Sequence, residues 1–298
     1  MPVMPNQLSK KEIIQRINHE RFNLRAAALV CLPALLLSML SFRWIDNLFL
    51  AALLFFAINM AASGVVTLYV HHKTGRWDAS TCALTLRPQI VSAALPEYFQ
   101  RVQIVPGRKL PWESLQFPFV RGCKAYEVDC YASGMHLTTP VEAELAAVGV
   151  MKTYQNTTSQ FQEERGTYQQ LEPSFEGMIY VAHLQRPFPQ ILLQTGGRRT
   201  EGAQTGDPAF DRVFSLQTGA PEQLMRLLSG SARRFLAETA GKIRGTVYIR
   251  FSPGGDVMVA VHQQIYDVKT KKGAEPFEKL DLQLQLFQGL INGLLGGF

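Results

Sequence analysis

Charged residues and cysteines are scarce in this sequence of 298 residues. Asp, Glu, Lys and Arg make up 18% of the chain, whereas globular domains carry about 25%. Four cysteines are too few for the disulfide framework of a small secreted scaffold. Apolar residues make up 47%, which excludes an intrinsically disordered chain.

Motifs for nucleotide binding and covalent catalysis are also missing. The sequence contains no G-x-G-x-x-G after an expected strand, no Walker lysine loop and no G-x-S-x-G elbow. Its cysteines do not form a metal-binding set, because Cys31 falls in an apolar run and Cys82 stands alone. We therefore expect no cofactor and no metal, and the sequence identifies no catalytic residue.

The net charge of +6 is unevenly distributed. Residues 1–25 carry five basic and two acidic residues, a surplus of three, and residues 26–86 add a surplus of one. Residues 87–298 carry 22 basic and 20 acidic residues, so the body of the chain is nearly neutral. A nucleic-acid-binding domain concentrates Lys and Arg in its folded body, so we expect no nucleic-acid partner.

Two uncharged runs follow the basic tail. They are Ala26–Phe42, with 17 residues, and Asn47–Val70, with 24 residues. A bilayer core needs about 20 helical residues, with about 17 as the lower limit. We therefore expect a transmembrane helical hairpin within 26–72, with spans at about 26–42 and 47–70. A cleaved signal peptide is the alternative for the first run, but residues 41–47 offer no small-residue cleavage site.

The distribution of Lys and Arg predicts the orientation of this hairpin. The turn at 43–46 has one basic residue, whereas Lys73, Arg76 and Arg87 follow the second run. Positive residues near membrane helices stay in the cytoplasm, so we expect both termini there, in a multi-pass protein of the bacterial inner membrane. The topology determinants in the basic cytoplasmic tail, residues 1–25, are Lys10, Lys11, Arg16, Arg21 and Arg25.

The tail itself allows two interpretations. Ile13, Ile14, Ile17 and Phe22 alternate with basic residues, a pattern that is compatible with an amphipathic helix on the membrane surface. A solvated tail whose charges only set the topology is equally compatible with the sequence.

The middle of the second run suggests how the membrane helices pack. Asn59 is strongly polar, and Ala57, Ala61 and Gly64 are small. Small residues four apart let helices approach closely, and an Asn adds an interhelical hydrogen bond. We expect these four residues to pack a hairpin or a dimer, because a transport pathway usually needs ionisable groups.

After the hairpin, we expect a Pro-rich spacer over 73–121 and a soluble domain over 122–298. The domain shows strand patterns first and helical periods later, so we expect an α+β fold with a mainly antiparallel sheet and helices. The expected strands lie at 122–131, 145–154, 175–184, 191–194 and 214–217, with a hairpin at 246–251 and 257–262, and the expected helices begin near 221, 231 and 277.

Few residues of this domain suggest chemistry. Tyr126, Val128 and Cys130 alternate with Glu127 and Asp129 along the first expected strand. The two acids share one face and could bind a cation, but a solvated strand face is the commoner case. His136, His183 and His262 are candidates to converge in space, although their spacing gives no support.

Two short motifs in the domain follow the two apolar runs. They are a Phe-x-Gly strand and an Asp-Pro-x-Phe-x-x-x-Phe segment, formed by Phe175, Gly177, Asp207, Pro208, Phe210 and Phe214. In these motifs and in its two N-terminal membrane helices the chain resembles the bacterial membrane family catalogued as domain of unknown function 3137. The resemblance covers most of 70–295, departs at the Gly-rich insert 196–206 and is poor over 121–158. It implies a bacterial inner membrane and carries no established activity.

These features leave two hypotheses for function. The first is a membrane-anchored binding or scaffold module that presents a cytoplasmic α+β domain, with the lipid bilayer and an unidentified protein as partners and a homo-oligomer left open. The second is a membrane-associated enzyme with a site assembled from the 121–131 strand, His183 and His262. The sequence favours the first, non-enzymatic role.

Overall fold

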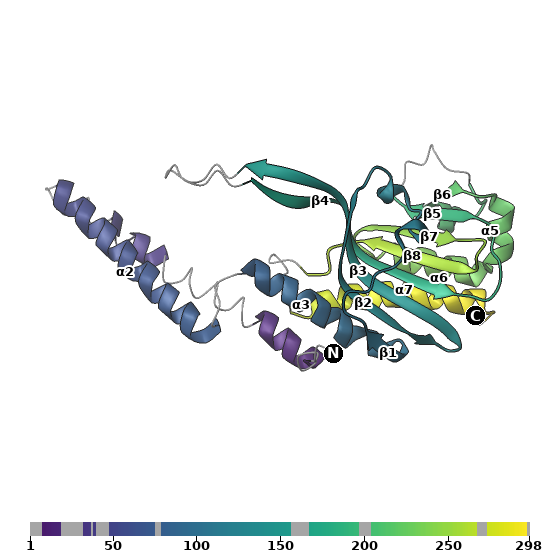
Figure 1. The fold of residues 1–298 in the computed structure, drawn as a ribbon, viewed down its shortest axis with the longest axis horizontal. Coiled ribbons are helices and arrows are strands. Elements are labelled where there is room, and N and C mark those ends of the chain that lie inside the picture. Colours follow the sequence, from purple (N-terminus) through teal and green to yellow (C-terminus); the bar gives the residue numbers. More distant parts are fainter. Residues whose placement is uncertain are drawn as a thin grey trace. The chain divides into compact units, whose positions relative to one another are not determined.

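The computed structural model describes residues 8–18, 32–36, 38–39, 48–74, 79–155, 167–196, 204–266 and 273–296. These residues form two compact units (Figure 1). The larger unit takes its described residues from 84–267 and 275–298, and the smaller takes them from 8–83 and 268–274.

One eight-stranded sheet forms the centre of the larger unit, with the strand order β1-β2-β3-β4-β8-β7-β5-β6. Every pair of neighbouring strands is antiparallel, which confirms the expected α+β class. The strands are β1 (Gln100–Ile104), β2 (Ala125–His136), β3 (Thr139–Gln155), β4 (Thr167–His183), β5 (Ile191–Thr195), β6 (Phe214–Thr218), β7 (Thr246–Phe251) and β8 (Asp256–His262).

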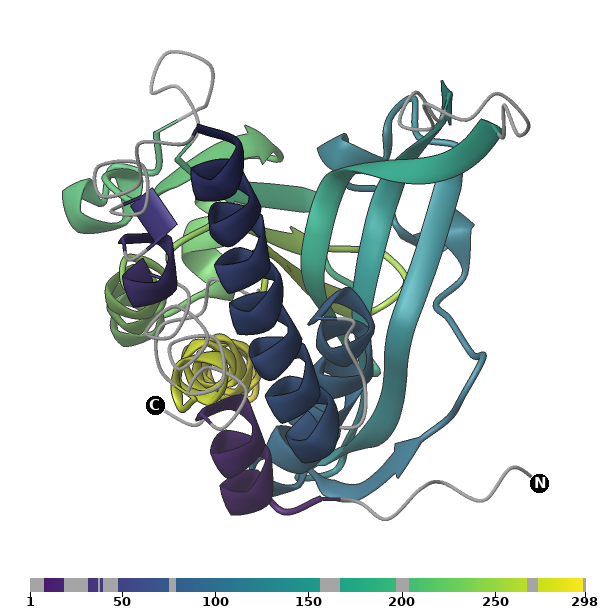
Figure 2. The same cartoon turned by 90° about the vertical axis from the view of Figure 1, so that its left-hand side faces the viewer.

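Helices cover one face of this sheet. The apolar period that predicts a C-terminal helix corresponds to α7, which buries Leu280, Leu284 and Phe287. Phe287 stacks on Tyr180 of β4 at 5.2 Å between ring centroids. Figure 2 shows α7 end-on. The helices with described residues in this unit are α3 (Ala79–Ala94), α4 (Pro208–Asp211), α5 (Pro221–Leu227), α6 (Gly230–Ala240) and α7 (Glu275–Leu294).

An irregular segment, residues 105–123, covers the opposite face, and we call it the covering segment. It contains the short helices η2 (Trp112–Ser114) and η3 (Pro118–Val120). Phe119 of this segment is buried and stacks on Phe175 of β4 at 4.1 Å. The Pro-rich stretch expected as a spacer therefore supplies β1 and a layer of the hydrophobic core.

A β-bulge in β2 changes which side chains share a face. The pairing register with β3 shifts between Val128 and Cys130. Tyr131 consequently joins Tyr126 and Val128 in the hydrophobic cluster under the covering segment. Cys130, which the simple alternation places with Tyr126, is buried outside that cluster, because a bulge inserts one extra residue on one strand.

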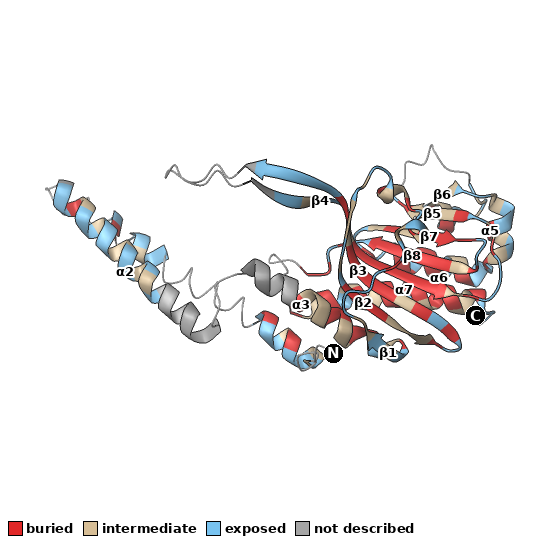
Figure 3. Ribbon diagram, in the orientation of Figure 1, coloured by how far each residue is buried: buried red, intermediate tan, exposed pale blue. Residues whose placement is uncertain are grey.

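Strands β3 and β4 extend beyond the body of the sheet as a two-stranded ribbon (Figure 1). Its described residues are 150–155 and 167–172, which we call the β ribbon. Of the described strands, β3 and β4 pair only with each other over this length. The ribbon is largely exposed (Figure 3), and it carries the exposed apolar side chains Val150, Met151 and Tyr154.

The smaller unit contains a helical segment over residues 10–18 and the helix α2 (Leu48–Thr74). Ser9 and Glu12 form a capping box at the start of the first: the Ser9 N–H donates to Glu12 Oε2 at 2.7 Å, and the Glu12 N–H donates to Ser9 Oγ at 3.3 Å. Ile13 and Ile17, four residues apart, are buried on one face. The tail is therefore helical over these residues, with its apolar side covered.

The transmembrane hairpin expected at 26–42 and 47–70 is not supported by the described residues. When only these are counted, no helix is long and apolar enough to cross a membrane. In α2 the described side chains run from 49 to 65, and in the first run the described residues are 32–36 and 38–39.

Candidate functional site

His183, at the end of β4, lies between two carboxylates from neighbouring strands. Its Nδ1 is 2.8 Å from Asp256 Oδ1 on β8, and its Nε2 is 3.4 Å from Glu142 Oε2 on β3. The hydrogen bond with Glu142, assisted by Asp256, raises the pKa of His183 to about 9. The imidazole therefore carries a positive charge at neutral pH.

Glu142 is fully engaged by its neighbours. Tyr131 OH donates to Oε1, and Arg108 Nη2 lies 3.2 Å from the same oxygen. The Arg108 guanidinium also lies over the Tyr131 ring, 4.8 Å from its centroid. The hydrogen bond from His183, with those from its other partners, lowers the pKa of Glu142. This carboxylate is ionised and has a donor on each oxygen.

Glu144 lies two residues further along β3, on the same face, and is completely buried. Tyr126 OH donates to its Oε1, and the Leu110 N–H donates to its Oε2 at 3.0 Å. Burial raises the pKa of Glu144 to about 7. Because Leu110 belongs to the covering segment, this carboxyl group holds that segment to the sheet.

Arg250 of β7 ends the row of charges across this face. The strand register places it opposite Met258, which lies opposite Val181, itself opposite Glu142. Arg250 is 7% exposed. Its Nη1 donates to Ser114 O at 2.8 Å, and its Nη2 donates to Gln116 Oε1 at 2.5 Å. Positive and negative side chains thus alternate in the order Arg108, Glu142, His183, Asp256 and Arg250.

This charged row is better suited to holding the strands and the covering segment together than to acid–base catalysis. His183 is already protonated, so it cannot serve as a neutral base at physiological pH. Glu144 titrates near neutrality but is completely buried. A cavity of about 420 Å³ on the same face is lined by Arg250 but by none of the other four members of the row.

The acids singled out on the first expected strand lie outside the row. Glu127 is exposed. Asp129 is the bulge residue and lies 3.8 Å from Arg87, which also pairs with Glu176 at 2.8 Å. Burial is the main cause that raises the pKa of Asp129. Among the described residues, no three His, Cys, Asp or Glu side chains are arranged to hold a metal ion.

The three candidate histidines do not converge. In the β4–β8 ladder His183 lies opposite Asp256, whereas His262 lies opposite Gly177, six residues away. At about 3.4 Å per residue this separates the two histidines by about 20 Å. His136 lies elsewhere, with its Nε2 2.9 Å from Asn292 Oδ1.

The four residues expected to pack the membrane helices, Ala57, Asn59, Ala61 and Gly64, all lie on α2 but differ in their contacts. Asn59 Nδ2 donates to Ser38 Oγ at 2.9 Å, which links the two uncharged runs, and to Phe55 O at 2.8 Å. Ala57 and Ala61 are exposed. A Cβ atom on Gly64 would meet no atom within 4 Å.

The basic residues of the tail are only partly described. Lys10, Lys11 and Arg16 lie on the helical segment 10–18, whereas Arg21 and Arg25 lie outside the described residues.

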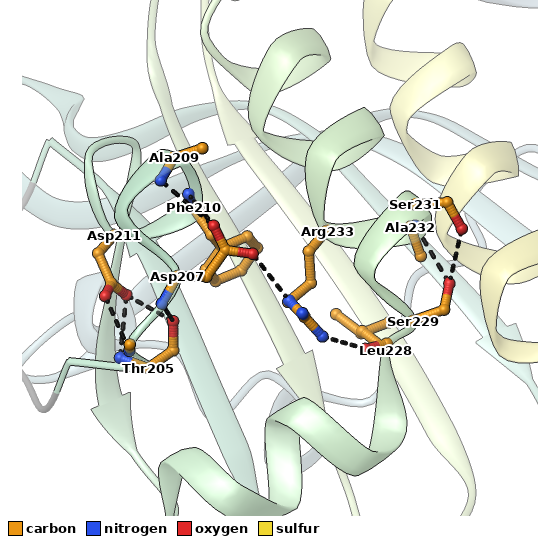
Figure 4. Close-up of polar contacts among 11 residues, drawn as sticks. Thr205, Asp207, Ala209, Phe210, Asp211, Leu228, Ser229, Ser231, Ala232 and Arg233 are labelled. Atoms are coloured by element: carbon orange, nitrogen blue, oxygen red, sulfur yellow. Dashed lines mark hydrogen bonds and ion pairs between the residues drawn. The ribbon is translucent and has the colours of Figure 1, made fainter.

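The Asp-Pro-x-Phe motif has a structural role (Figure 4). Asp207 caps α4, because its Oδ1 accepts from the N–H groups of Ala209 and Phe210, both at 3.2 Å. Its Oδ2 accepts from Arg233 Nε of α6 at 3.1 Å. Phe210 is buried and stacks on Phe214 at 4.9 Å. These contacts join α4, α6 and β6.

The Phe-x-Gly motif is structural as well. Phe175 is completely buried under the covering segment. A Cβ atom on Gly177 would overlap the carbonyl oxygen of Val261 on β8. The glycine is therefore needed for β4 and β8 to pair.

Most members of the charged row were not among the sequence candidates. His183 was, but Arg108, Glu142, Asp256 and Arg250 were not singled out. Tyr131, which donates to Glu142, lies within the 121–131 strand. The available signal is in β3, where Glu142 and Glu144 alternate with the buried Val141 and Ala143. Acids on a strand with apolar flanks need partners.

No family model matches the chain, and neither a curated protein nor a solved structure matches it.

Proposed function

We propose that the chain is a membrane-anchored binding protein, held by its N-terminal apolar segments at the cytoplasmic face of the bacterial inner membrane. One observation carries this proposal: α2 presents large apolar side chains that are at least 42% exposed. An apolar surface of this kind is unfavourable in water and favourable in lipid. The side chains are Phe49, Leu50, Leu53, Leu54, Phe56, Met60 and Val65.

The polar groups of these segments also suit a lipid environment. The amide of Asn59 is used within the protein, by Ser38 Oγ and Phe55 O. Ser38 Oγ in turn donates to Leu35 O at 2.8 Å. A polar side chain in lipid needs such internal partners. The surplus of three positive charges in residues 1–25 supports a cytoplasmic N-terminus.

The geometry of the larger unit favours binding over catalysis. Glu142, His183 and Asp256 are occupied by one another, and His262 is remote from them. The β ribbon instead offers outer strand edges with which no other described strand pairs, next to exposed apolar side chains. Protein partners bind such edges by adding a strand. We therefore propose a protein partner at the β ribbon, and the enzyme hypothesis is the weaker one.

The membrane anchor is tested by fractionation and reporter fusions in a bacterial host. We expect the full chain to stay in the membrane pellet after an alkaline carbonate wash. A green fluorescent protein fused after Phe298 should fluoresce, and an alkaline phosphatase at the same place should be inactive. Release of the chain by carbonate, or an active phosphatase, would contradict the proposal.

The binding surface is tested by photo-crosslinking in living cells. A photoreactive amino acid in place of Tyr154, on the β ribbon, should give an adduct with a partner protein. The same amino acid in place of Arg244, an exposed residue outside the ribbon, is the control and should give none. An adduct at twice the chain mass of 33.3 kDa would identify a second copy as the partner. The absence of any adduct at position 154 would contradict the proposal that a protein partner binds at the β ribbon.

A further inference from the structure

The cavity of about 420 Å³ lies between the covering segment and the strands β5, β6 and β7. Its size falls in the range of small-molecule sites, about 300–1,000 Å³. Its floor is formed by the buried side chains of Leu115, Phe117 and Arg250 and by the half-buried Leu192, which lies opposite Arg250 in the β5–β7 pairing. Exposed polar side chains form its rim, namely Glu113, Gln116, Arg121, Gln190 and Thr218.

Arg250 is a buried charge without an ion pair of its own in the described part of the chain. Both of its hydrogen bonds go to neutral acceptors, Ser114 O and Gln116 Oε1. Burial lowers the pKa of Arg250, and Asp256 acts in the opposite direction, but the Asp256 carboxylate is hydrogen-bonded to His183 at 2.8 Å. A buried cation that lacks a counterion is unfavourable. Three of its five N–H groups remain available for an acceptor in the cavity.

We propose that this cavity binds a small organic anion, whose carboxylate or phosphate group pairs with Arg250 and whose apolar body lies against Phe117 and Leu192. The planar guanidinium matches the two oxygens of such a group. Two arginines and one glutamate line the cavity, a balance of one positive charge, which suits a monoanion. The inference goes beyond the proposed function, because it requires neither the membrane nor the protein partner.

The test uses the full chain in detergent with three probes that share a phenyl ring: benzoate, phenyl phosphate and uncharged benzyl alcohol. Binding is followed by tryptophan fluorescence, because Trp112 lines the cavity, and by the rise in Tm that a bound ligand causes. We expect at least one anion to bind saturably and more tightly than the alcohol. Benzoate and phenyl phosphate distinguish a carboxylate ligand from a phosphate ligand.

The key variant is Arg250→Met, which removes the charge and keeps a long side chain in its place. It should weaken anion binding about 10- to 100-fold, as expected for loss of charged hydrogen bonds. Arg244→Met removes the same charge from an exposed position and should bind like the wild type. Thr218→Trp places a large side chain at the exposed rim, where it obstructs the cavity without altering the buried floor, and it should abolish anion binding. This variant tests the proposal if Arg250→Met does not fold.

Two results would overturn the proposal. One is that neither anion binds better than benzyl alcohol. The other is that Thr218→Trp, or a folded Arg250→Met, binds the anions as well as Arg244→Met does.

Discussion

Glu144 and His183 bind protons more tightly in the folded chain than in the unfolded one. The pKa of Glu144 rises from 4.5 to about 7, and that of His183 rises from 6.5 to about 9. In each interval the folded state carries more protons than the unfolded state, so the free energy of unfolding decreases as the pH rises. Glu144 lowers the stability as the pH rises from 4.5 to about 7, and His183 does so as the pH rises from 6.5 to about 9.

Glu144→Gln should remove the pH dependence between 4.5 and 7. The amide oxygen can still accept from the Leu110 N–H, and the amide NH2 can donate to Tyr126 OH in place of the bond that the carboxylate accepts. The amide cannot ionise. The wild type should lose about 3 kcal/mol across this window from the group, and the variant should not. Urea denaturation at pH 5, 6 and 7 measures the difference. Glu127→Gln, at an exposed position on β2, is the control and should keep the wild-type slope.

His183→Asn should change the pH dependence of stability between about pH 6.5 and 9. The wild-type Tm should fall between pH 6.5 and 9 as the imidazolium loses its proton and the attraction of Glu142 and Asp256. The variant should have a lower Tm at pH 6 and a flatter profile above it. His262→Asn, at an exposed position, serves as the matched control. A profile for His183→Asn that is as steep as the control's would exclude this role.

Sequence reasoning identified one member of this site and missed its partners for a physical reason. His183 is 73 residues from Asp256, so only the pairing of β4 with β8 brings them together. The bulge in β2 also places Tyr131 with Tyr126, where simple alternation places Cys130. Long-range register and bulges leave no periodic trace in the sequence.

Regular periodicity did predict the main elements. The hairpin expected at 246–251 and 257–262 corresponds to β7 and β8, and the helix expected from 277 corresponds to α7. The failures lie in segments without a period. The covering segment was expected to be a spacer because of its prolines, yet it buries Leu110, Phe117 and Phe119 one side chain at a time.

The outer half of β4 was missed for a related reason. Residues 167–172 lie in a mostly polar interval and were expected to form a loop, but they are the part of β4 that pairs with β3 alone among the described strands. A ribbon without a buried face needs no apolar alternation.

The β4–β8 ladder should depend on Gly177. Gly177→Ala places a Cβ atom against Val261 O, and a clash with backbone cannot be relieved by a change of rotamer. We expect the free energy of unfolding to fall by about 3 kcal/mol or more. Gly254→Ala is the matched control, since its Cβ would meet Ser252 Oγ at 3.9 Å, and it should change little. Equal stability of the two variants in denaturant titrations would refute this role for the ladder.

Most of the basic surplus and the largest group of exposed apolar side chains on a described helix lie before residue 87. Residues 1–86 hold +4 of the net +6, from surpluses of three over 1–25 and one over 26–86, and the body holds the remaining two. The sequence pI of about 9.2 therefore comes mainly from the segments before residue 87. The larger unit has its own sheet and core, so it should fold without the segments before residue 84.

A fragment of residues 84–298 should therefore not associate with membranes. We expect it to remain in the supernatant after ultracentrifugation, to unfold cooperatively in urea and to bind the same anion probes as the full chain. The full chain should sediment with membranes under the same conditions. A fragment that also sediments with membranes would place the anchor in the larger unit.

The β4–β8 ladder also affects how the new chain folds during synthesis. Strands β1 to β4 are consecutive and can pair as soon as they emerge, but β8 begins 73 residues after β4 ends. At about 5–20 residues per second, the ribosome leaves the edge of β4 unpaired for roughly 4 to 15 s. This edge carries Met178, Ile179, Tyr180 and Val181, an apolar strand of the type that aggregates with other chains. The nascent protein is most exposed to aggregation in this interval, when a chaperone that shields β4 would protect it.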